Sequence, residues 1–183
     1  MINLNLIEKK YDEKVILKDI SLRINPMDIL VIKGESGVGK TTLLRIMSGL
    51  DRDFKGTIKN TFRKQSISFS QKVFLGRLSA FDEVKVLSKA EDPIIKSSLK
   101  YFDLYKCKDN LAKNLSTGQK TRLSLIRALL TRSEIVYLDE PFLGLDLYNK
   151  EKAIDFIKEN LNNRTLIYTG DELGFNKEQI YEL

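Results

Sequence analysis

The 183-residue sequence predicts an α/β fold with a mainly parallel sheet, to which the N-terminal residues add an antiparallel β edge. Two observations carry this prediction. Short apolar runs, typical of strands buried on both faces, alternate along the chain with stretches of helical spacing. Residues 2–8 and 15–24 instead alternate apolar and polar side chains around a turn at 12–14, as strands with one solvated face do.

The first third of the chain is expected to run from strand through loop to helix. Residues 29–32 form a short β-branched run that stops before Gly34, which favours a buried strand. Over residues 41–48 the apolar side chains recur at helical spacing, and Gly49 is expected to end this helix.

The later elements alternate in the same way. Residues 56–69 are expected to form two short strands, and residues 79–113 are helical in composition with a break at Pro93. The remaining elements are a helix after Ser116, a strand over 135–138, a helix over 147–161 and a strand over 165–168.

The composition indicates a single cytosolic domain. Hydrophobic residues make up 42% of the sequence, which is enough for a core and argues against extended disorder. No signal peptide is recognisable, and no apolar run reaches the roughly 20 residues that cross a bilayer. The single Cys107 excludes an internal disulfide and a cysteine-based metal site. The basic residues behind the net charge of +6 are scattered, so we expect an ordinary soluble surface and no nucleic-acid partner; the alternative is attraction to an anionic membrane surface or to nucleic acid.

One segment fits the phosphate-binding pattern G-x-x-x-x-G-K-[ST]: Gly34, Glu35, Ser36, Gly37, Val38, Gly39, Lys40 and Thr41. It lies between a predicted strand and a predicted helix, as the pattern requires. Glycines let successive backbone N–H groups turn toward an anion, and the helix that begins near Gly39 adds its positive end. Lys40 is expected to reach the β- and γ-phosphates of a nucleotide, and the Thr41 hydroxyl is expected to bind Mg²⁺.

The apolar run of residues 135–138 ends in two carboxylates, Asp139 and Glu140. Ligands bind outside the carboxyl ends of buried parallel strands, so both side chains are expected to face the nucleotide. Asp139 is suited to hold Mg²⁺, directly or through water. Glu140 is placed to polarise an attacking water, and positioned general bases contribute about 10²–10⁴-fold. The alternative is an acidic pair that only opens the turn before Pro141.

Between these motifs lies a third segment: Leu115, Ser116, Thr117, Gly118 and Gln119. Ser116 and Gln119 fit a capping box at a helix start. The capping box does not explain Gly118, because glycine at the second helical position lowers helix stability by up to about 1 kcal/mol. A glycine there would let a phosphate approach the backbone. Since one γ-phosphate does not need two such elements from one chain, a partner chain could use this one.

These motifs, in this order, resemble those of the nucleotide-binding subunit of an ATP-binding cassette (ABC) transporter. The resemblance runs from about residue 3 to the last residue. The segment Gly34–Thr42 resembles the family's Walker A loop, and Thr42 is its last residue. Leu115–Gln119 resembles its signature LSGGQ, with Thr117 in place of the first glycine, and Ile135–Glu140 resembles Walker B with the catalytic glutamate. The resemblance implies a P-loop NTPase core with a small helical subdomain inserted at roughly 72–115.

Three further positions follow from the resemblance. Gln71 resembles the Q-loop glutamine that touches Mg²⁺ and the lytic water, and Asp146 lies in a segment that resembles the D-loop. Tyr11 stands where the family places an aromatic ring on the adenine, a stacking contact worth about 1–3 kcal/mol. The alternatives are that Tyr11 is a turn aromatic and Gln71 a plain surface residue.

The resemblance also implies partners. Two cassettes, as a homodimer or a heterodimer, pair head to tail with two ATP molecules between them, each held by one chain's Walker loop and the other chain's signature helix. ATP favours the closed pair because the signature helix reaches the γ-phosphate only there. Opening and closing would move separate integral membrane subunits, which places the chain on the inner face of the cell membrane.

One departure from the family pattern follows the predicted strand at 165–168. Gly170 stands where the family has its switch-loop histidine, and the sequence contains no histidine. We therefore expect normal binding of Mg-ATP with slow hydrolysis in isolation, unless a partner cassette supplies the histidine. Two other functions stay open: a nucleotide-gated binding module with little turnover, and a soluble ABC-type ATPase that acts on ribosomes or DNA.

Overall fold

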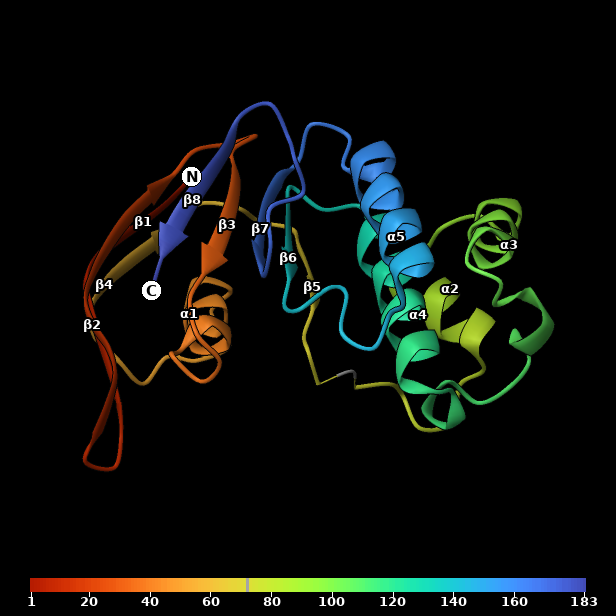
Figure 1. The fold of residues 1–183 in the computed structure, drawn as a ribbon, viewed down its shortest axis with the longest axis horizontal. Coiled ribbons are helices and arrows are strands. Elements are labelled where there is room, and N and C mark those ends of the chain that lie inside the picture. The colour runs from red at the N-terminus through yellow and green to blue at the C-terminus, as the bar shows by residue number, and fades with distance from the viewer. Residues whose placement is uncertain (72) are drawn as a thin grey trace. The chain divides into compact units, whose positions relative to one another are not determined.

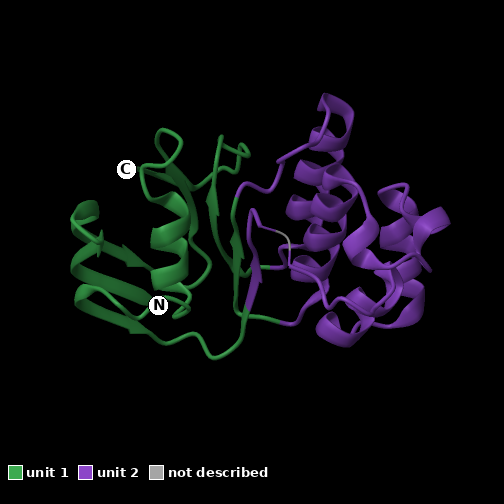
Figure 2. Ribbon diagram, turned by 90° about the horizontal axis from the view of Figure 1, so that it is seen from below, with its two compact units in different colours: residues 1–65, 133–139, 163–183 green, residues 66–132, 140–162 purple. Residues whose placement is uncertain are grey.

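The structure is a computed structural model that describes residues 1–71 and 73–183. The chain divides into two compact units, drawn in different colours in Figure 2. Unit 1 contains residues 1–65, 133–139 and 163–183, and unit 2 contains residues 66–132 and 140–162. Each unit is therefore assembled from segments that are distant in the sequence.

Unit 1 contains an antiparallel sheet in the order β2-β1-β4 (Figure 1). Its strands are β1 (Ile2–Tyr11), β2 (Lys14–Ile24) and β4 (Lys55–Asn60). Burial along β1 follows the expected alternation near its start, because Ile2 and Leu4 are buried and the residues between and after them are exposed. The predicted antiparallel N-terminal strands are confirmed, and β4 joins them as a third strand.

Four further strands of unit 1 run parallel in the order β6-β7-β3-β8. They are β3 (Ile29–Lys33), β6 (Ile135–Leu138), β7 (Thr165–Thr169) and β8 (Glu178–Glu182). Every residue of β6 and β7 is buried, including the two threonines that begin and end β7. Since the strands are parallel, the carboxyl ends of β3, β6 and β7 lie at one edge of the sheet.

Helix α1 (Lys40–Met47) follows β3 and packs against β7. Its buried side chains are Leu43, Leu44, Ile46 and Met47. After the helix, Gly49 N–H donates to Ile46 O and Leu50 N–H donates to Arg45 O, the two bonds of a Schellman motif. The predicted end of this helix at Gly49 is confirmed.

Unit 2 is mainly helical. Its helices are α2 (Ala80–Ser88), α3 (Asp92–Tyr101), α4 (Thr117–Leu130) and α5 (Leu147–Asn160), with short 3₁₀ turns at Tyr105–Cys107 and Ala112–Asn114. The strand β5 (Gln65–Ser68) leads into the unit. Pro93 lies in the first turn of α3, where its missing N–H breaks no helical bond, so it begins a helix after the predicted break.

The core of unit 2 forms around α4, which contacts α2, α3 and α5. A buried ion pair crosses this core: Arg127 Nη1 of α4 lies 2.8 Å from Oε1 of Glu83, whose side chain is 0% exposed. The same guanidinium donates to Val73 O at 3.1 Å, and Glu83 Oε2 accepts the N–H of Leu75 at 3.1 Å. The pair thus ties the segment 73–75 to two helices.

The substitution Arg127→Met is expected to lower the free energy of unfolding by about 3–5 kcal/mol, because it leaves the Glu83 carboxylate buried without its cation. Chemical denaturation measures this loss. The control is Lys85→Met, which breaks the exposed ion pair with Asp92 and is expected to change stability little. Equal stability of Arg127→Met and the wild type would contradict the assigned role of the buried pair.

Candidate functional site

The phosphate-loop segment connects β3 directly to α1, as the sequence predicts. Gly34, Gly37 and Gly39 all have positive φ angles, so the loop uses backbone conformations that other residues rarely adopt. The Lys40 ammonium lies 2.8 Å from the carbonyl oxygens of both Gly34 and Glu35. These bonds hold the cation over the start of the loop, where it can also donate to a phosphate.

Thr41, in the first turn of α1, is hydrogen-bonded to Asp139, the residue that follows β6. Its Oγ1 lies 3.0 Å from Oδ1 and 2.9 Å from Oδ2 of the carboxylate, although 98 residues separate the two. Asp139 is 1% exposed, so the burial of its charge requires such donors. The structure therefore brings together the two unit-1 residues predicted to hold Mg²⁺.

The chemistry of this pair fits Mg²⁺. A hydroxyl and a carboxylate are hard oxygen ligands, and Mg²⁺ is typically bound by one or two carboxylates together with phosphates and waters. Among the residues that the structure describes, no group of three or more Asp, Glu, His or Cys side chains could hold a metal. A site completed by nucleotide phosphates is the arrangement that this donor set can support.

Thr169 at the end of β7 is a site residue that the sequence analysis missed. Its Oγ1 donates to Asp139 Oδ1 at 3.0 Å, and the side chain is completely buried. The signal that could have found it is strand register: β6 and β7 pair Leu138 with Tyr168, so the next residues, Asp139 and Thr169, are neighbours. That register depends on which strands are adjacent, and no motif in the sequence reports it.

Glu140 follows Asp139 directly but belongs to unit 2. Its backbone φ is 45°, in the left-handed region that non-glycine residues seldom occupy. The turn is closed by a hydrogen bond from Leu143 N–H to Glu140 O at 3.1 Å. Such backbone conformations cluster at functional sites, which agrees with the predicted role of this glutamate.

The capping box at the start of α4 is confirmed. Ser116 Oγ accepts the N–H of Gln119 at 3.3 Å, and Gln119 Oε1 accepts the N–H of Ser116 at 2.9 Å. Leu115 is buried and anchors the segment, while Ser116 and Thr117 are exposed. The helix start is thus fixed from within unit 2, and its polar end faces solvent.

The structure gives a reason for glycine at position 118 that the sequence did not reveal. A Cβ at this position would lie 2.7 Å from the carbonyl oxygen of Gly144. Nearby, Thr121 Oγ1 donates to Leu143 O at 2.8 Å, so the first turns of α4 pack directly on the backbone of 143–144. Close approach of protein backbone is therefore sufficient to require glycine here.

Asp146, the predicted D-loop residue, is the N-cap of α5. Its Oδ1 accepts the backbone N–H of Asn149 at 2.8 Å and the Asn149 side chain at 2.9 Å. These hydrogen bonds lower the pKa of Asp146. Arg122 of α4 donates to Asn149 Oδ1 at 3.0 Å, so the starts of α4 and α5 are linked.

Tyr11 ends β1 and is 48% exposed. Its hydroxyl donates to Asp51 Oδ2 at 3.3 Å, and Lys9 Nζ lies 4.9 Å from its ring centroid. Lys9 is buried and pairs with Asp51 at 3.1 Å and Asp53 at 3.2 Å. The ring is therefore held by its neighbours, and its predicted stacking on adenine stays a prediction.

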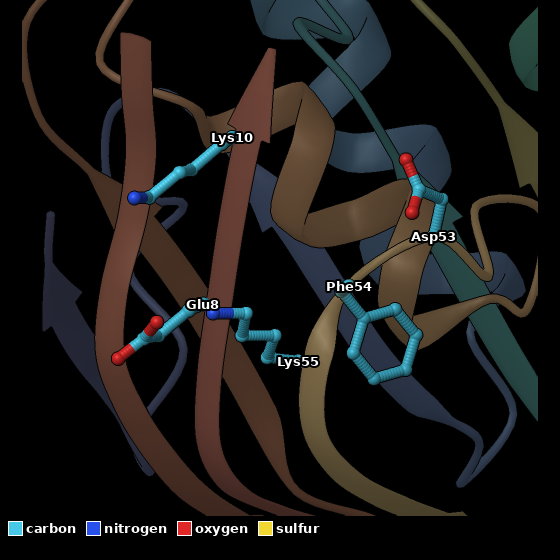
Figure 3. Close-up of a pocket in the computed structure, with 5 residues that line it drawn as sticks. All are labelled: Glu8, Lys10, Asp53, Phe54 and Lys55. Atoms are coloured by element: carbon cyan, nitrogen blue, oxygen red, sulfur yellow. The ribbon is translucent and has the colours of Figure 1, made fainter. Parts of the chain in front are cut away.

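A pocket of about 180 Å³ lies on unit 1, beside the Lys9–Asp53 ion pair (Figure 3). It is lined by Glu8, Lys10, Asp53, Phe54 and Lys55. Its lining carries both signs of charge and includes none of the residues predicted to bind nucleotide, so we assign it no role in the candidate site.

The loop after β7 contains Gly170, where the resemblance predicts a histidine and the sequence has none. Gly170 has a φ of 127°, and the space that a Cβ would enter is open within 4 Å. Two contacts shape this loop: Glu172 forms a 2.7 Å ion pair with Lys33 at the end of β3, and the Tyr168 hydroxyl bonds to Glu178. Glu172 raises the pKa of Lys33, and burial followed by the bond to Glu178 raises that of Tyr168.

The predicted site residues are thus distributed between the two units. Unit 1 carries Tyr11, the phosphate-loop segment 34–42, Asp139 and Gly170. Unit 2 carries Glu140, the exposed Gln71 and the two segments around Gly118 and Asp146. The functional roles assigned to these residues stay predictions.

Comparison with known proteins decides the family. A family model described as ABC transporter matches residues 17–143, more than half of the chain. The chain belongs to the ABC transporter family. The match includes the phosphate loop, the α4 capping segment and the Asp139–Glu140 pair, while Tyr11, Asp146 and Gly170 lie outside it.

Curated relatives in this family carry import names. The chain is 32% identical over 169 residues to the spermidine/putrescine import ATP-binding protein PotA of Spiroplasma citri. This alignment covers 83% of this chain and 48% of that protein. It is 31% identical over 153 residues to the aliphatic sulfonates import ATP-binding protein SsuB 1 of Streptomyces avermitilis, which covers 82% and 58%. The chain spans about half the length of these curated relatives.

Solved ABC cassettes share the fold. A dimeric post-hydrolysis state of the ATP-binding cassette MJ0796, bound to ADP and phosphate, matches with a TM-score of 0.81 and 23% identity over 94% of this chain and 89% of that one. A putative ABC transporter ATP-binding protein from Pyrococcus furiosus matches with a TM-score of 0.82 and 23% identity over 100% and 96%. The predicted P-loop ATPase fold is therefore confirmed. In the described part of the chain, none of the helices combines the length and apolar character that a membrane span needs.

The substitution Gly118→Ala separates two physical effects with opposite signs. Helix propensity alone would raise stability by up to about 1 kcal/mol, whereas overpacking against Gly144 lowers it by about 1–3 kcal/mol. We expect a net loss, measured by chemical denaturation. The control for a Cβ without a clash is Gly76→Ala, in a turn where a Cβ meets open space. A Gly118→Ala variant more stable than the wild type would contradict the close approach seen here.

Proposed function

We propose that this ABC family member binds Mg-ATP through Gly34–Thr42 and hydrolyses it with Glu140 as general base. The observation that carries the proposal is the contact of Thr41 with the buried Asp139 carboxylate, at 2.9–3.0 Å, beside a lysine held over the phosphate loop. Residues 1–183 act as one nucleotide-binding domain, with the region of roughly 72–115 as its helical subdomain.

Each residue has a definite task in this proposal. The loop N–H groups and Lys40 neutralise the β- and γ-phosphates, and Tyr11 stacks on the adenine. Thr41 and Asp139 hold Mg²⁺, which when bound neutralises charge that develops on the phosphates. Glu140 accepts a proton from the attacking water, and Gln71 orients that water.

The start of α4 serves a second copy of the site. Ser116 and Thr117 are exposed, and the capping box fixes the backbone N–H groups of a helix N-terminus that can receive phosphate. We therefore propose that the chain pairs head to tail with another ABC subunit, whose ATP contacts this segment. Because the contact exists only in the closed pair, ATP stabilises closure.

The import names of the curated relatives support a role in transport. The chain would power import through separate integral membrane subunits, and it would act at the inner face of the cell membrane without a nucleic-acid partner. The choice between a homodimer and a heterodimer, and the imported substrate, depend on those subunits.

Gly170 supports a refinement in which hydrolysis is slow in the isolated chain. Without a histidine at this position, the γ-phosphate lacks one polar contact and the water lacks one positioning group. The absence of a histidine at this position also favours the second candidate function, a nucleotide-gated binding module with little ATP hydrolysis.

The substitution Glu140→Gln tests the catalytic role. It removes the base but keeps the size of the side chain, so ATP hydrolysis is expected to fall about 10²–10⁴-fold while binding of a fluorescent ATP analogue is retained. Phosphate release and fluorescence titration measure the two effects. Glu151→Gln, on the exposed face of α5, is the control. Unchanged hydrolysis in Glu140→Gln would remove this residue from the mechanism.

The effect of the missing histidine needs a control for backbone strain, because φ at position 170 is 127°. Gly170→His and Gly170→Ala both introduce a Cβ and so carry the same strain. If the imidazole restores one hydrogen bond, hydrolysis in Gly170→His is expected to exceed that in Gly170→Ala by roughly tenfold. Equal rates in the two variants would show that the histidine position does not limit turnover.

A further inference from the structure

The hydroxyl of Thr169 occupies a central place in the sheet of unit 1. β7 lies between β6 and β3, and its last residue pairs with Ile32, two positions before the phosphate loop. On the other side, Thr169 Oγ1 donates to Asp139 Oδ1 at 3.0 Å. One fully buried threonine thus stands beside both strand ends that carry the proposed Mg-ATP site.

The two threonines that are hydrogen-bonded to Asp139 differ in whether they are proposed to bind the metal. Thr41 is itself a proposed Mg²⁺ ligand, so its hydroxyl must serve the ion and the carboxylate together. Thr169 donates from a buried strand and is not among the proposed ligands. Its bond can therefore keep the carboxylate in place while Thr41 is occupied by the metal.

We propose that Thr169 is a positioning residue for Mg²⁺: its hydroxyl holds the Asp139 carboxylate in the orientation that the bound ion requires. The inference rests on the proposed binding of Mg-ATP. Groups that orient a metal ligand in this way typically change metal affinity by about 10–100-fold when removed. A bond that merely satisfies a buried carboxylate would affect stability and leave the Mg²⁺ dependence of nucleotide binding unchanged.

Two pairs of proteins isolate the effect of the Thr169 hydroxyl. The wild-type threonine and Thr169→Val differ by the hydroxyl at nearly constant shape, and Thr169→Ser and Thr169→Ala differ by the hydroxyl after the methyl group has been removed. The full chain is titrated with Mg²⁺ in the presence of a fluorescent ATP analogue, and a second titration of the nucleotide is made in EDTA. If Thr169→Val does not fold, the Ser and Ala pair still gives the comparison.

The hydroxyl-free member of each pair is expected to need about 10–100-fold more Mg²⁺ for half-maximal nucleotide binding, with metal-free binding unchanged. The matched control is Thr165→Val on the same strand. Its hydroxyl accepts the N–H of Met27 at 2.8 Å, so the substitution removes a part-buried hydrogen bond at the other end of β7. This control is expected to lose stability and to keep the wild-type Mg²⁺ dependence.

Equal Mg²⁺ dependence within each pair would overturn the inference, as would a shift in Thr165→Val as large as that in Thr169→Val. A wild-type chain that binds nucleotide with the same affinity in Mg²⁺ and in EDTA would refute the magnesium site, and the inference with it. A wild-type chain that binds no nucleotide would instead refute the proposed function. The failures are therefore distinguishable.

Discussion

The buried carboxylate of Asp139 is the constraint on which the candidate site of unit 1 depends. A negative charge that is 1% exposed is stable only if hydrogen-bond donors surround it, and Thr41 and Thr169 supply donors from two different elements. The carboxylate therefore joins the first turn of α1 to the ends of β6 and β7. Since α1 begins where the phosphate loop ends, the same bonds set the position of the loop relative to the sheet.

Unit 2 is organised by contacts of a different kind. The start of α4 is fixed by its capping box and by the close approach of Gly118 to the Gly144 carbonyl. The buried pair of Arg127 and Glu83 holds the backbone of the segment 73–75. These contacts give unit 2 a rigid helix start whose polar end is exposed, which is the property that a partner's phosphate would need.

One of the points at which the chain passes between the units is the peptide bond that joins Asp139 to Glu140. The proposed metal-holding group therefore ends a buried strand, and the proposed base begins a turn with a left-handed backbone. The two neighbouring carboxylates have different surroundings, which suits their different proposed tasks. The separate roles of the two carboxylates, and the departure from the family pattern expected at Gly170, stay predictions.

Features that depend on neighbours a few residues away could be predicted from the amino-acid order alone. The phosphate-loop spacing, the capping box at Ser116 and the apolar strands are local patterns, and all were predictable. The contacts of Thr169 with Asp139 and of Gly118 with Gly144 join residues about 26–30 positions apart. They depend on which strands and helix starts become neighbours. Close packing in the folded chain selects those neighbours, and no local sequence pattern reports them.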